Sequence, residues 1–493
     1  MVPQELILSA CSIAGPSSTS TSKNTTSTPS IHLHDLLTSS PVHTFKNSSS
    51  ASHSLSAIPT ENGQGGGVFA VQEGKAMVNI WAWQKDQMHL KLHLPEKMTC
   101  FAVSPNGLWA AGGSPNGHIY VWELASGLLV SSHTAHYRAL TSLTFTPDSH
   151  LLISTSLDSS AHVYLVSRLI DPEDPASAGK PYGVLSDHTL AVRCVGLSKM
   201  AGSAGGRCWT ASDDGTVKMW SLHPPFDLLC TFTLPTSSSP STLAIDPSER
   251  FFYVGTTQGV VYHVPLFRRR GVVGGNAIEE GYEAVGGGGS GSAPIKTEGA
   301  VITLKTPITA LSLSISTTHL LLGTSLGTIS IHSLPSHQHL RTLSPHSGPI
   351  SSLSTMIRPP DLISAPGTSS SGIGSGGNRS ENWPMMEIKP LERMKVRSAK
   401  EVQESTILLR PSSTLLSQLD ELRSPSQRKE RGLSVRGSDG GGASSQIGDQ
   451  LSELMAENKK LRLSLERADK INERMWNGMV DLKLGTADLS TTS

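Results

Sequence analysis

The side chains with the most evident chemical potential form two sets that follow the same order along the chain. Each set has a histidine in a loop, a hydroxyl residue at the end of an apolar stretch, an aspartate in a turn and then an aromatic residue. Such groups hydrogen-bond to one another when folding removes them from water. We interpret them as buried networks that hold loops in place; the alternative is unconnected polar residues at the surface. The first set is His136, Asp158, Tyr164 and either Ser154 or Ser156; the second is His188, Asp214, Trp220 and either Thr210 or Ser212; Trp122 takes the aromatic position of a third copy.

Other patterns that carry catalytic or ligand-binding chemistry are missing from the sequence. There is no GxxxxGK[ST] phosphate loop, no metalloprotease helix and no zinc spacing of cysteines. His32 and His34 flank Leu33 on an alternating strand, where a structural role is favoured because no further metal ligands accompany them. Asp213 and Asp214 lie in a turn and do not form a catalytic carboxylate pair. We therefore expect no catalytic residue, no cofactor and no metal, and a protein that is not an enzyme.

Both polar sets belong to a repeat whose clearest part is a short phrase that recurs along the chain. It reads as a strand end, a tight Asp-Gly or Asn-Gly turn and an alternating strand that closes on Trp and Leu, as in residues 211–222 (ASDDGTVKMWSL) and 114–124 (SPNGHIYVWEL). Repetition at about 40–45 residues with this ending is typical of a WD-repeat β-propeller. The sequence therefore predicts an all-β, seven-bladed WD-repeat β-propeller, followed by an irregular tail and a C-terminal α-helical coiled coil. The segments that match the third strand of a blade are Ile31–Leu36, Val78–Trp83, Ile119–Leu124, Ala161–Val166, Val217–Leu222, Val261–Leu266 and Ile329–Leu334.

Length and composition limit what else the chain contains. A propeller of this size needs most of residues 1–360 of the 493, and the remainder is too rich in Ser, Gly and Pro for a second core. The 40 basic and 40 acidic residues cancel, which argues against capture of nucleic acid or membranes by overall charge but not against local patches. The five cysteines form no CxxC pair and predict buried thiols in a reducing compartment. No apolar run approaches the roughly 20 residues of a membrane-spanning helix, so we expect an intracellular protein with no membrane partner.

Low-complexity segments interrupt and follow the predicted propeller. Because Gly/Ser-rich stretches behave as flexible coil, we expect flexible inserts at residues 16–30, 47–67, 171–181 and 268–299. Residues 361–445 should be a largely disordered linker. Within it, residues 383–422 mix apolar and charged side chains, a composition typical either of a segment that folds onto a partner or onto the side of the propeller, or of plain linker.

Residues 446–485 carry the pattern of a coiled-coil helix. One apolar track recurs every seven residues and a second falls between its members, as at the d and a positions of a heptad. Asparagines occupy two of the a positions, and buried Asn at a favours a parallel two-stranded coil. We predict a homodimer through this helix; the alternatives are antiparallel or heteromeric pairing and packing against another protein. The predicted seam is Ile447, Leu451, Leu454, Asn458, Leu461, Leu465, Ala468, Asn472, Met475, Met479 and Leu482.

Three stretches within the repeats carry a more specific resemblance. Residues 117–141 (GHIYVWELASGLLVSSHTAHYRALT), 185–198 (LSDHTLAVRCVGLS) and 244–259 (AIDPSERFFYVGTTQG) are similar, in this order, to the WD-repeat subunit of the eukaryotic pre-ribosomal Rix/Ipi complex. The layout of propeller, insert before the last blade, irregular tail and terminal coiled coil also fits that family. The long Ser/Thr- and Gly-rich inserts depart from it, which leaves the family's loop contacts open for this chain.

The resemblance implies a non-catalytic scaffold subunit in the nucleus, in both nucleolus and nucleoplasm. Its role would be rRNA processing, including removal of the second internal transcribed spacer, and maturation of the large ribosomal subunit. The implied partners are a helical-repeat subunit of the same complex, the pre-60S particle and its AAA-type ATPase. Basic groups at residues 268–270 and 389–400 suggest direct contact with pre-rRNA phosphates, the alternative being solvated loops. An adaptor propeller of another complex, such as a ubiquitin ligase or a chromatin or replication-licensing assembly, is the competing function.

Overall fold

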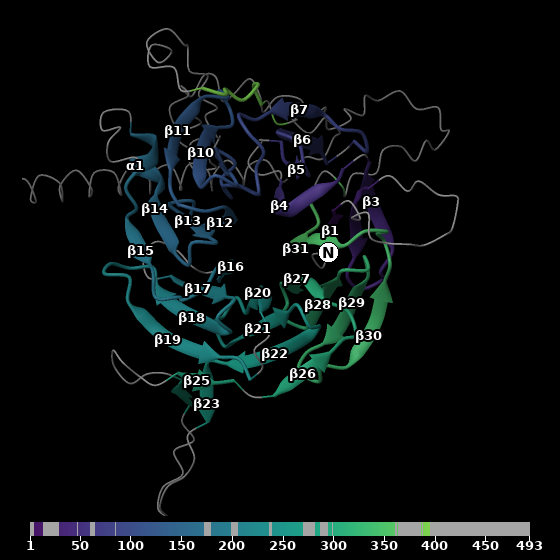
Figure 1. The fold of residues 1–493 in the computed structure, drawn as a ribbon. Coiled ribbons are helices and arrows are strands. Elements are labelled where there is room, and N and C mark those ends of the chain that lie inside the picture. The colour runs from purple at the N-terminus through teal and green to yellow at the C-terminus, as the bar shows by residue number, and fades with distance from the viewer. Residues whose placement is uncertain are drawn as a thin grey trace, which may run out of the picture. The chain divides into compact units, whose positions relative to one another are not determined.

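Seven β-sheets surround a central axis in the computed structural model of the protein (Figure 1). The described residues are 4–12, 29–46, 48–59, 65–83, 85–171, 179–198, 206–235, 239–269, 282–285, 294–297, 299–359, 362, 386 and 388–394. The predicted coiled coil at residues 446–485 and most of the linker at residues 361–445 lie outside them. Within the described residues, the prediction of an all-β, seven-bladed propeller is confirmed.

Each sheet is one blade, and its strands follow one another from the central axis outward. Blade 1 contains β31 (Ile350–Ile357), β1 (Glu5–Cys11), β2 (Ile31–Asp35) and β3 (Pro41–Phe45). Blade 2 contains β4 (Ser50–Ile58), β5 (Gly67–Gln72), β6 (Met77–Ala82) and β7 (Leu90–His93). Blade 3 contains β8 (Cys100–Val103), β9 (Trp109–Gly113), β10 (His118–Glu123) and β11 (Leu129–Thr134). Blade 4 contains β12 (Leu140–Phe145), β13 (Leu151–Ser156), β14 (Ala161–Leu165) and β15 (Gly183–Leu185), with the short helix α1 (Val166–Ile170) after β14.

The other three blades follow the same plan. Blade 5 contains β16 (Val192–Leu197), β17 (Arg207–Ser212), β18 (Thr216–Ser221) and β19 (Leu228–Thr233), to which β25 (Ile295–Lys296) adds a parallel fifth strand. Blade 6 contains β20 (Pro240–Ile245), β21 (Phe251–Thr256), β22 (Val260–Pro265) and β26 (Ala300–Thr303). Blade 7 contains β27 (Ile308–Leu313), β28 (His319–Thr324), β29 (Ile329–Ser333) and β30 (His339–Leu343). The seven predicted third strands correspond to β2, β6, β10, β14, β18, β22 and β29.

The two ends of the propeller sequence close the ring. The innermost strands contact one another in sequence, from β4 through β8, β12, β16, β20 and β27 to β31, which returns to β4. Blade 1 takes β31 from the end of the propeller sequence and its other strands from the beginning. β1 and β31 pair antiparallel from Glu5 opposite Ile357 to Cys11 opposite Ile350. This pairing joins the beginning of the propeller sequence to its end and so completes blade 1 within the ring.

The apolar core lies between neighbouring blades. Middle strands such as β13 and β28 are buried along nearly their whole length, because each face of a blade packs against a neighbouring blade. Trp209 of blade 5 packs on Phe252 of blade 6 with ring centroids 6.3 Å apart, and Phe45 of blade 1 packs on Trp81 of blade 2 at the same distance. Each blade is therefore stabilised by both of its neighbours rather than by a core of its own.

The prediction of a flexible insert at residues 47–67 is wrong for residues 50–58. The chain forms β4 at Ser50–Ile58, the innermost strand of blade 2. Its serine-rich sequence conceals the strand pattern, but Leu55 and Ala57 pack against the core between blades 1 and 2. Small side chains suit a strand beside the crowded axis, which is why this composition does not indicate flexible coil at this position.

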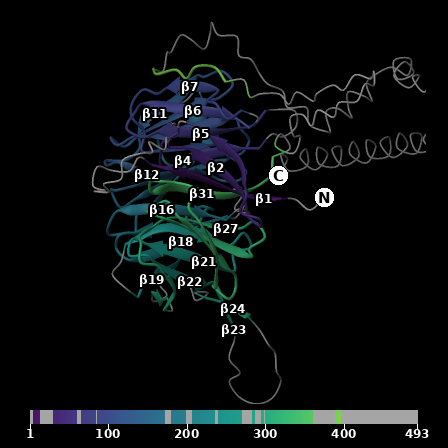
Figure 2. The same cartoon turned by 90° about the vertical axis from the view of Figure 1, so that its right-hand side faces the viewer.

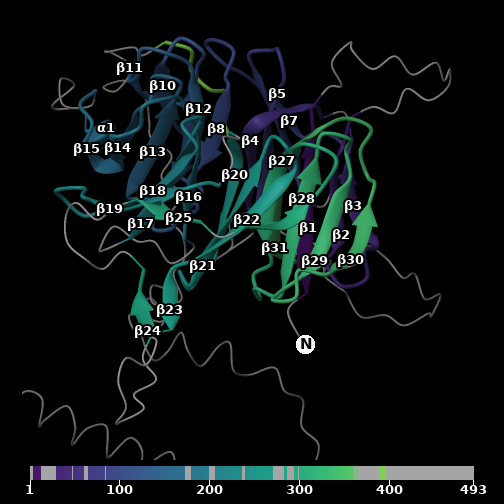
Figure 3. The same ribbon diagram turned by 60° about the horizontal axis from the view of Figure 1, so that its bottom comes forward.

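Two other predicted inserts are partly structured, and one lies mostly outside the described residues. Within residues 268–299, β23 (Phe267–Arg269) pairs with β24 (Tyr282–Ala284), and β25 joins blade 5. Figure 3 shows the β23–β24 hairpin extending away from the blades. Residues 179–181 of the 171–181 segment lead directly into the outer strand of blade 4. Residues 16–28 lie outside the described residues, between β1 and β2.

Candidate functional site

The predicted polar set of blade 5 forms one continuous hydrogen-bonded chain. His188 precedes the innermost strand, and its Nδ1 lies 3.0 Å from Asp214 Oδ2 in the turn between β17 and β18. His188 Nε2 lies 2.8 Å from Thr210 Oγ1, and the Trp220 indole Nε1 donates to the same hydroxyl at 2.8 Å. Because an ionised carboxylate only accepts, His188 Nδ1 donates to Asp214, and Nε2 accepts from the threonine. The open choice between Thr210 and Ser212 is thereby settled in favour of Thr210.

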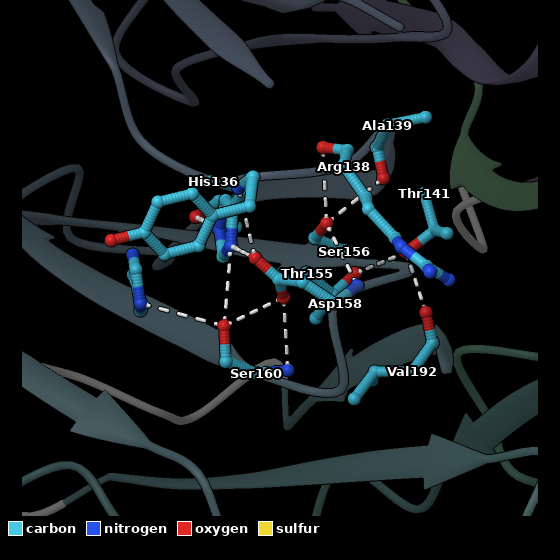
Figure 4. Close-up of polar contacts among 12 residues, drawn as sticks. His136, Arg138, Ala139, Thr141, Thr155, Ser156, Asp158, Ser160 and Val192 are labelled. Atoms are coloured by element: carbon cyan, nitrogen blue, oxygen red, sulfur yellow. Dashed lines mark hydrogen bonds and ion pairs between the residues drawn. The ribbon is translucent and has the colours of Figure 1, made fainter. Parts of the chain in front are cut away.

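The polar set of blade 4 repeats this arrangement with one difference. His136 Nδ1 lies 2.9 Å from Asp158 Oδ2 (Figure 4). His136 Nε2 lies 2.8 Å from Ser154 Oγ, so Ser154 rather than Ser156 is the hydroxyl partner. Tyr164 takes the aromatic position, but its hydroxyl lies 3.3 Å from His162 Nδ1. The structure therefore brings together three of the four predicted members and places Tyr164 beside the network rather than in it.

These hydrogen bonds keep the aspartates of both networks ionised. Burial opposes ionisation of Asp214, but hydrogen bonds from His188 and Thr216 outweigh it and hold the pKa of this carboxyl well below its usual range. The pKa of Asp158 is lowered in the same way, by Ser160 and by His136. Burial lowers the pKa of His136, against the attraction of Asp158. At neutral pH each pair therefore consists of a carboxylate and a histidine that fix each other's geometry.

The networks fix the loops at one end of the blades. Asp214 Oδ2 accepts the Thr189 N–H at 3.2 Å, and Asp158 Oδ2 accepts the Tyr137 N–H at 3.2 Å. The two remaining hydroxyl candidates bind loop carbonyls: Ser212 Oγ donates to Leu190 O at 2.9 Å, and Ser156 Oγ donates to Arg138 O at 3.2 Å. The polar sets therefore stiffen loops and present no reactive group to solvent.

Trp122 of blade 3 takes part in a different contact. Its indole Nε1 donates to the main-chain oxygen of Glu392 at 2.9 Å, although the two residues are 270 positions apart. Glu392 N–H in turn donates to Gly127 O at 2.8 Å, in the turn between β10 and β11. Trp122 thus holds a segment of the C-terminal tail instead of joining a histidine network.

Residues 388–394, the tail strap, dock on the rim of blades 2 and 3. The Leu391 side chain is 6% exposed and packs with Trp122, Leu92 and Leu129. Two views show the strap along the outer rim beside β7 and β11 (Figures 1 and 2). For these residues, the alternatives left open by the sequence are resolved in favour of folding onto the side of the propeller. The rest of residues 383–422, apart from Met386, lies outside the described residues.

A third histidine–hydroxyl pair was not predicted, and it lies where the ring closes. His346 Nε2 lies 2.9 Å from Ser9 Oγ, which joins the loop before β31 to β1. Ser9 pairs with His32 in the same register in which Thr210 pairs with Lys218. The phrase SPHSGPI at residues 344–350 resembles the loops that contain His136 and His188, so an alignment of loops instead of third strands would have found it.

The described residues offer no metal site and no reactive thiol at the surface. Among the described ranges, no group of three or more His, Cys, Asp or Glu side chains is placed to hold a metal ion. The five cysteines are buried and free. The part of the chain that the structure covers contains no helix long and apolar enough to cross a membrane. The predicted dimer seam, from Ile447 to Leu482, lies outside the described residues.

The ring of four-stranded blades with loop histidine networks defines a WD-repeat β-propeller. The WD domain, G-beta repeat family matches residues 85–123, 127–164 and 179–221, which include both networks. Three relatives are named pre-rRNA-processing proteins. IPI3 of Mycosarcoma maydis is 28% identical over 90% of this chain and 92% of its own length. IPI3 of Yarrowia lipolytica is 34% identical over 63% of this chain and 69% of its own, and crb3/ipi3 of Schizosaccharomyces pombe is 30% identical over 72% and 78%.

For the first relative, the similarity covers nearly the whole chain. The chain belongs to the IPI3 family of pre-rRNA-processing WD-repeat proteins. Fold and family together point to a non-catalytic protein with a role in rRNA processing and ribosome biogenesis.

Proposed function

We propose that this protein is a scaffold subunit of a nuclear complex that assembles the large ribosomal subunit. In this role it would support removal of the second internal transcribed spacer from precursor rRNA, beside a helical-repeat subunit, on a pre-60S particle that an AAA-type ATPase also engages. The observation that carries the proposal is the similarity to a pre-rRNA-processing protein over 90% of the chain. The loops stiffened by His136 and His188 are consistent with this role, because preordered loops lose little entropy on binding a partner.

Purification of the tagged full-length protein from its own cells tests the proposal. We expect large-subunit precursor rRNA that still contains the second spacer, together with a helical-repeat protein, in the eluate. Depletion of the protein should cause spacer-containing precursors to accumulate while small-subunit rRNA is processed normally. An eluate without large-subunit precursors, combined with unchanged spacer removal after depletion, would refute the proposal.

The homodimer remains part of this proposal and rests on the sequence of residues 446–485. A parallel pair of helices would place two propellers on one particle and increase avidity where both find sites. Asn458 and Asn472 set the expected two-chain state, so replacing both with Leu should raise the stability of the coil but relax its preference for dimers. Sedimentation of the full-length protein tests this, and a monomer at micromolar concentration would contradict it.

A further inference from the structure

The outer rim of blades 1 to 3 carries exposed basic side chains from three separate parts of the chain. Lys46 follows β3, Lys91 lies in β7, and Lys389 and Arg393 belong to the tail strap. All four side chains are exposed, and none forms an ion pair with another described residue. We call them the rim cations.

Packing brings the strap cations to the rim of the propeller. In β7 the exposed Lys91 precedes the buried Leu92, and Leu92 belongs to the same apolar cluster as Leu391 of the strap. The strap alternates in the same manner: Leu391 is buried, whereas Lys389 and Arg393 on either side of it are exposed. Docking of Leu391 therefore places the two exposed charges of the strap on the rim that carries Lys91. Figure 2 shows the backbone of the strap beside β7.

Lys46 and Lys91 border one hollow on this rim. Its volume is about 480 Å³, and it is lined by Lys46 and by residues 87–91 of the segment that leads into β7. His89 and Gln87 add further polar groups to the lining. Two lysines from different blades thus line a space that an anionic group can enter.

The acidic side chains nearby already have partners. Glu96 accepts from Tyr120 Oη at 2.6 Å and from Asn116 Nδ2 at 2.9 Å. Asp86 lies 3.2 Å from His43 Nε2, and Glu392 Oε2 accepts the Leu129 N–H at 3.5 Å. Glu96 and Glu392 are therefore turned toward protein donors, whereas the Asp86 side chain is 56% exposed beside His43. The rim cations themselves form no ion pair with another described residue, which leaves them available to an anionic ligand.

We propose that the rim cations bind the phosphate backbone of RNA. This proposal rests on the proposed role in precursor rRNA processing and names a contact surface for it. Among the described strap residues, Met394 is the one large apolar side chain that is exposed, at 77%. Protein docking sites centre on buried aromatic or apolar anchors, whereas RNA-backbone binding needs several well-spaced cations. The rim matches the second description.

Binding of the purified full-length protein to a mixed-sequence single-stranded RNA oligonucleotide tests the proposal. In fluorescence anisotropy at physiological salt, the double variants K46A/K91A and K389A/R393A should each bind about tenfold more weakly than the parent protein. Each should also reduce the slope of log affinity against log salt by about 1.4, because two phosphate contacts are lost at about 0.7 each. The double variant K180A/K305A is the control with the same change in charge, since both lysines are exposed in other blades.

The variant Leu391→Ala tests whether docking of the strap builds the site. It changes no charge, yet it should weaken RNA binding as much as K389A/R393A does, and the two changes together should not add. Equal weakening in K180A/K305A, absence of RNA binding by the parent protein, or unchanged binding in the rim variants would overturn the proposal. Recovery of precursor rRNA with the protein from cells is measured separately, so a negative binding result leaves the proposed function standing.

Discussion

Trp220 of blade 5 and Trp122 of blade 3 hold the same position in their third strands, yet their indole N–H groups bind different partners. Trp220 donates to Thr210 and completes the chain of hydrogen bonds through His188 to Asp214. Trp122 donates to the main chain of Glu392 in the tail strap. One tryptophan stabilises its own blade, and the other holds a remote part of the chain.

The neighbouring strand explains the difference. Thr210 lies opposite Lys218 in blade 5, and the matching residue in blade 3, opposite Tyr120, is Gly112. Gly112 offers no hydroxyl, and Met98 and Trp122 both come within 3.2 Å of the place where its Cβ would lie. Because a buried indole N–H needs an acceptor, Trp122 is satisfied by a carbonyl brought from outside the blade. Because blade 3 has no hydroxyl beside its tryptophan, the Trp122 indole is available to bind the tail strap instead.

The sharpest test of this comparison is Thr210→Val, for which we expect the largest loss of stability. Valine keeps the shape of threonine but removes the hydroxyl, which leaves Trp220 Nε1 and His188 Nε2 buried without a partner. At about 1–3 kcal/mol for each of the two orphaned groups, the free energy of unfolding should fall by about 2–6 kcal/mol. Urea unfolding followed by circular dichroism measures the change.

Ser154→Ala in blade 4 is the matched control for Thr210→Val. Ser154 has one network partner, His136 Nε2, because Tyr164 bonds elsewhere. The loss should therefore be about half as large. Equal losses in the two variants would show that Trp220 gains nothing from Thr210, and the proposed difference between the networks would fail.

Blades 4 and 5 also differ at the residue paired with the network hydroxyl, and this difference should make the stability of blade 4 depend on pH. His162 stacks on His136 with ring centroids 4.1 Å apart, where blade 5 has Lys218. Burial and the adjacent His136 lower the pKa of His162 to about 4. A histidine in the unfolded chain takes up a proton near pH 6.5, whereas His162 in the folded protein stays neutral down to about pH 4. The free energy of unfolding therefore has its full value, as far as His162 is concerned, above pH 6.5 and falls as the pH drops toward 4.

His162→Asn should flatten this acid dependence. Between pH 6.5 and 4, the free energy of unfolding of the parent protein should fall more steeply than that of the variant, by up to about 1.4 kcal/mol per pH unit. Urea unfolding at a series of pH values measures both slopes. His150→Asn is the control, because the His150 side chain is 68% exposed. A parental slope retained in His162→Asn would contradict the assignment.

Features that recur in every blade could be predicted from the sequence, whereas features that occur only once could not. The repeated pattern of apolar positions locates all seven third strands, because each strand must bury side chains against the next blade. A tight Asp-Gly or Asn-Gly turn marks only the clearest copies, before β18 and β10. The networks of His136 and His188 follow from their recurrence. β4 was missed because serines beside the axis conceal its pattern. For the strap, the sequence left folding onto the propeller, folding onto a partner and plain linker open, because Leu391 has no repeat to mark its place. Its partner, Trp122, is distinguished only by the glycine opposite Tyr120.

The ring seam shows what the same hydrogen bond does between distant segments. Ser9→Ala removes the hydroxyl partner of His346 Nε2, and His346 Nδ1 has no hydrogen-bond partner among the described residues. We expect a loss of about 1–2 kcal/mol, smaller than for Thr210→Val because one group is orphaned instead of two. The loss should appear as faster amide hydrogen exchange in β1 and β31, which this contact helps to join. Faster exchange confined to other blades would contradict the role of Ser9 in the seam.

Trp122→Phe should have the smallest global effect and the most local one. The variant keeps an aromatic ring in the core but removes the N–H group that holds Glu392 O. We expect the free energy of unfolding to fall by about 1 kcal/mol or less, because the strap lies outside the blades. Amide exchange and proteolysis within residues 388–394 should accelerate strongly, since the Glu392 N–H bond to Gly127 O depends on the same docking. Trp220→Phe is the counterpart: it should destabilise blade 5 and leave the strap protected. If Trp122→Phe leaves the exchange of residues 388–394 unchanged, then burial of Leu391 alone holds the strap, and the two tryptophans differ less than their partners suggest.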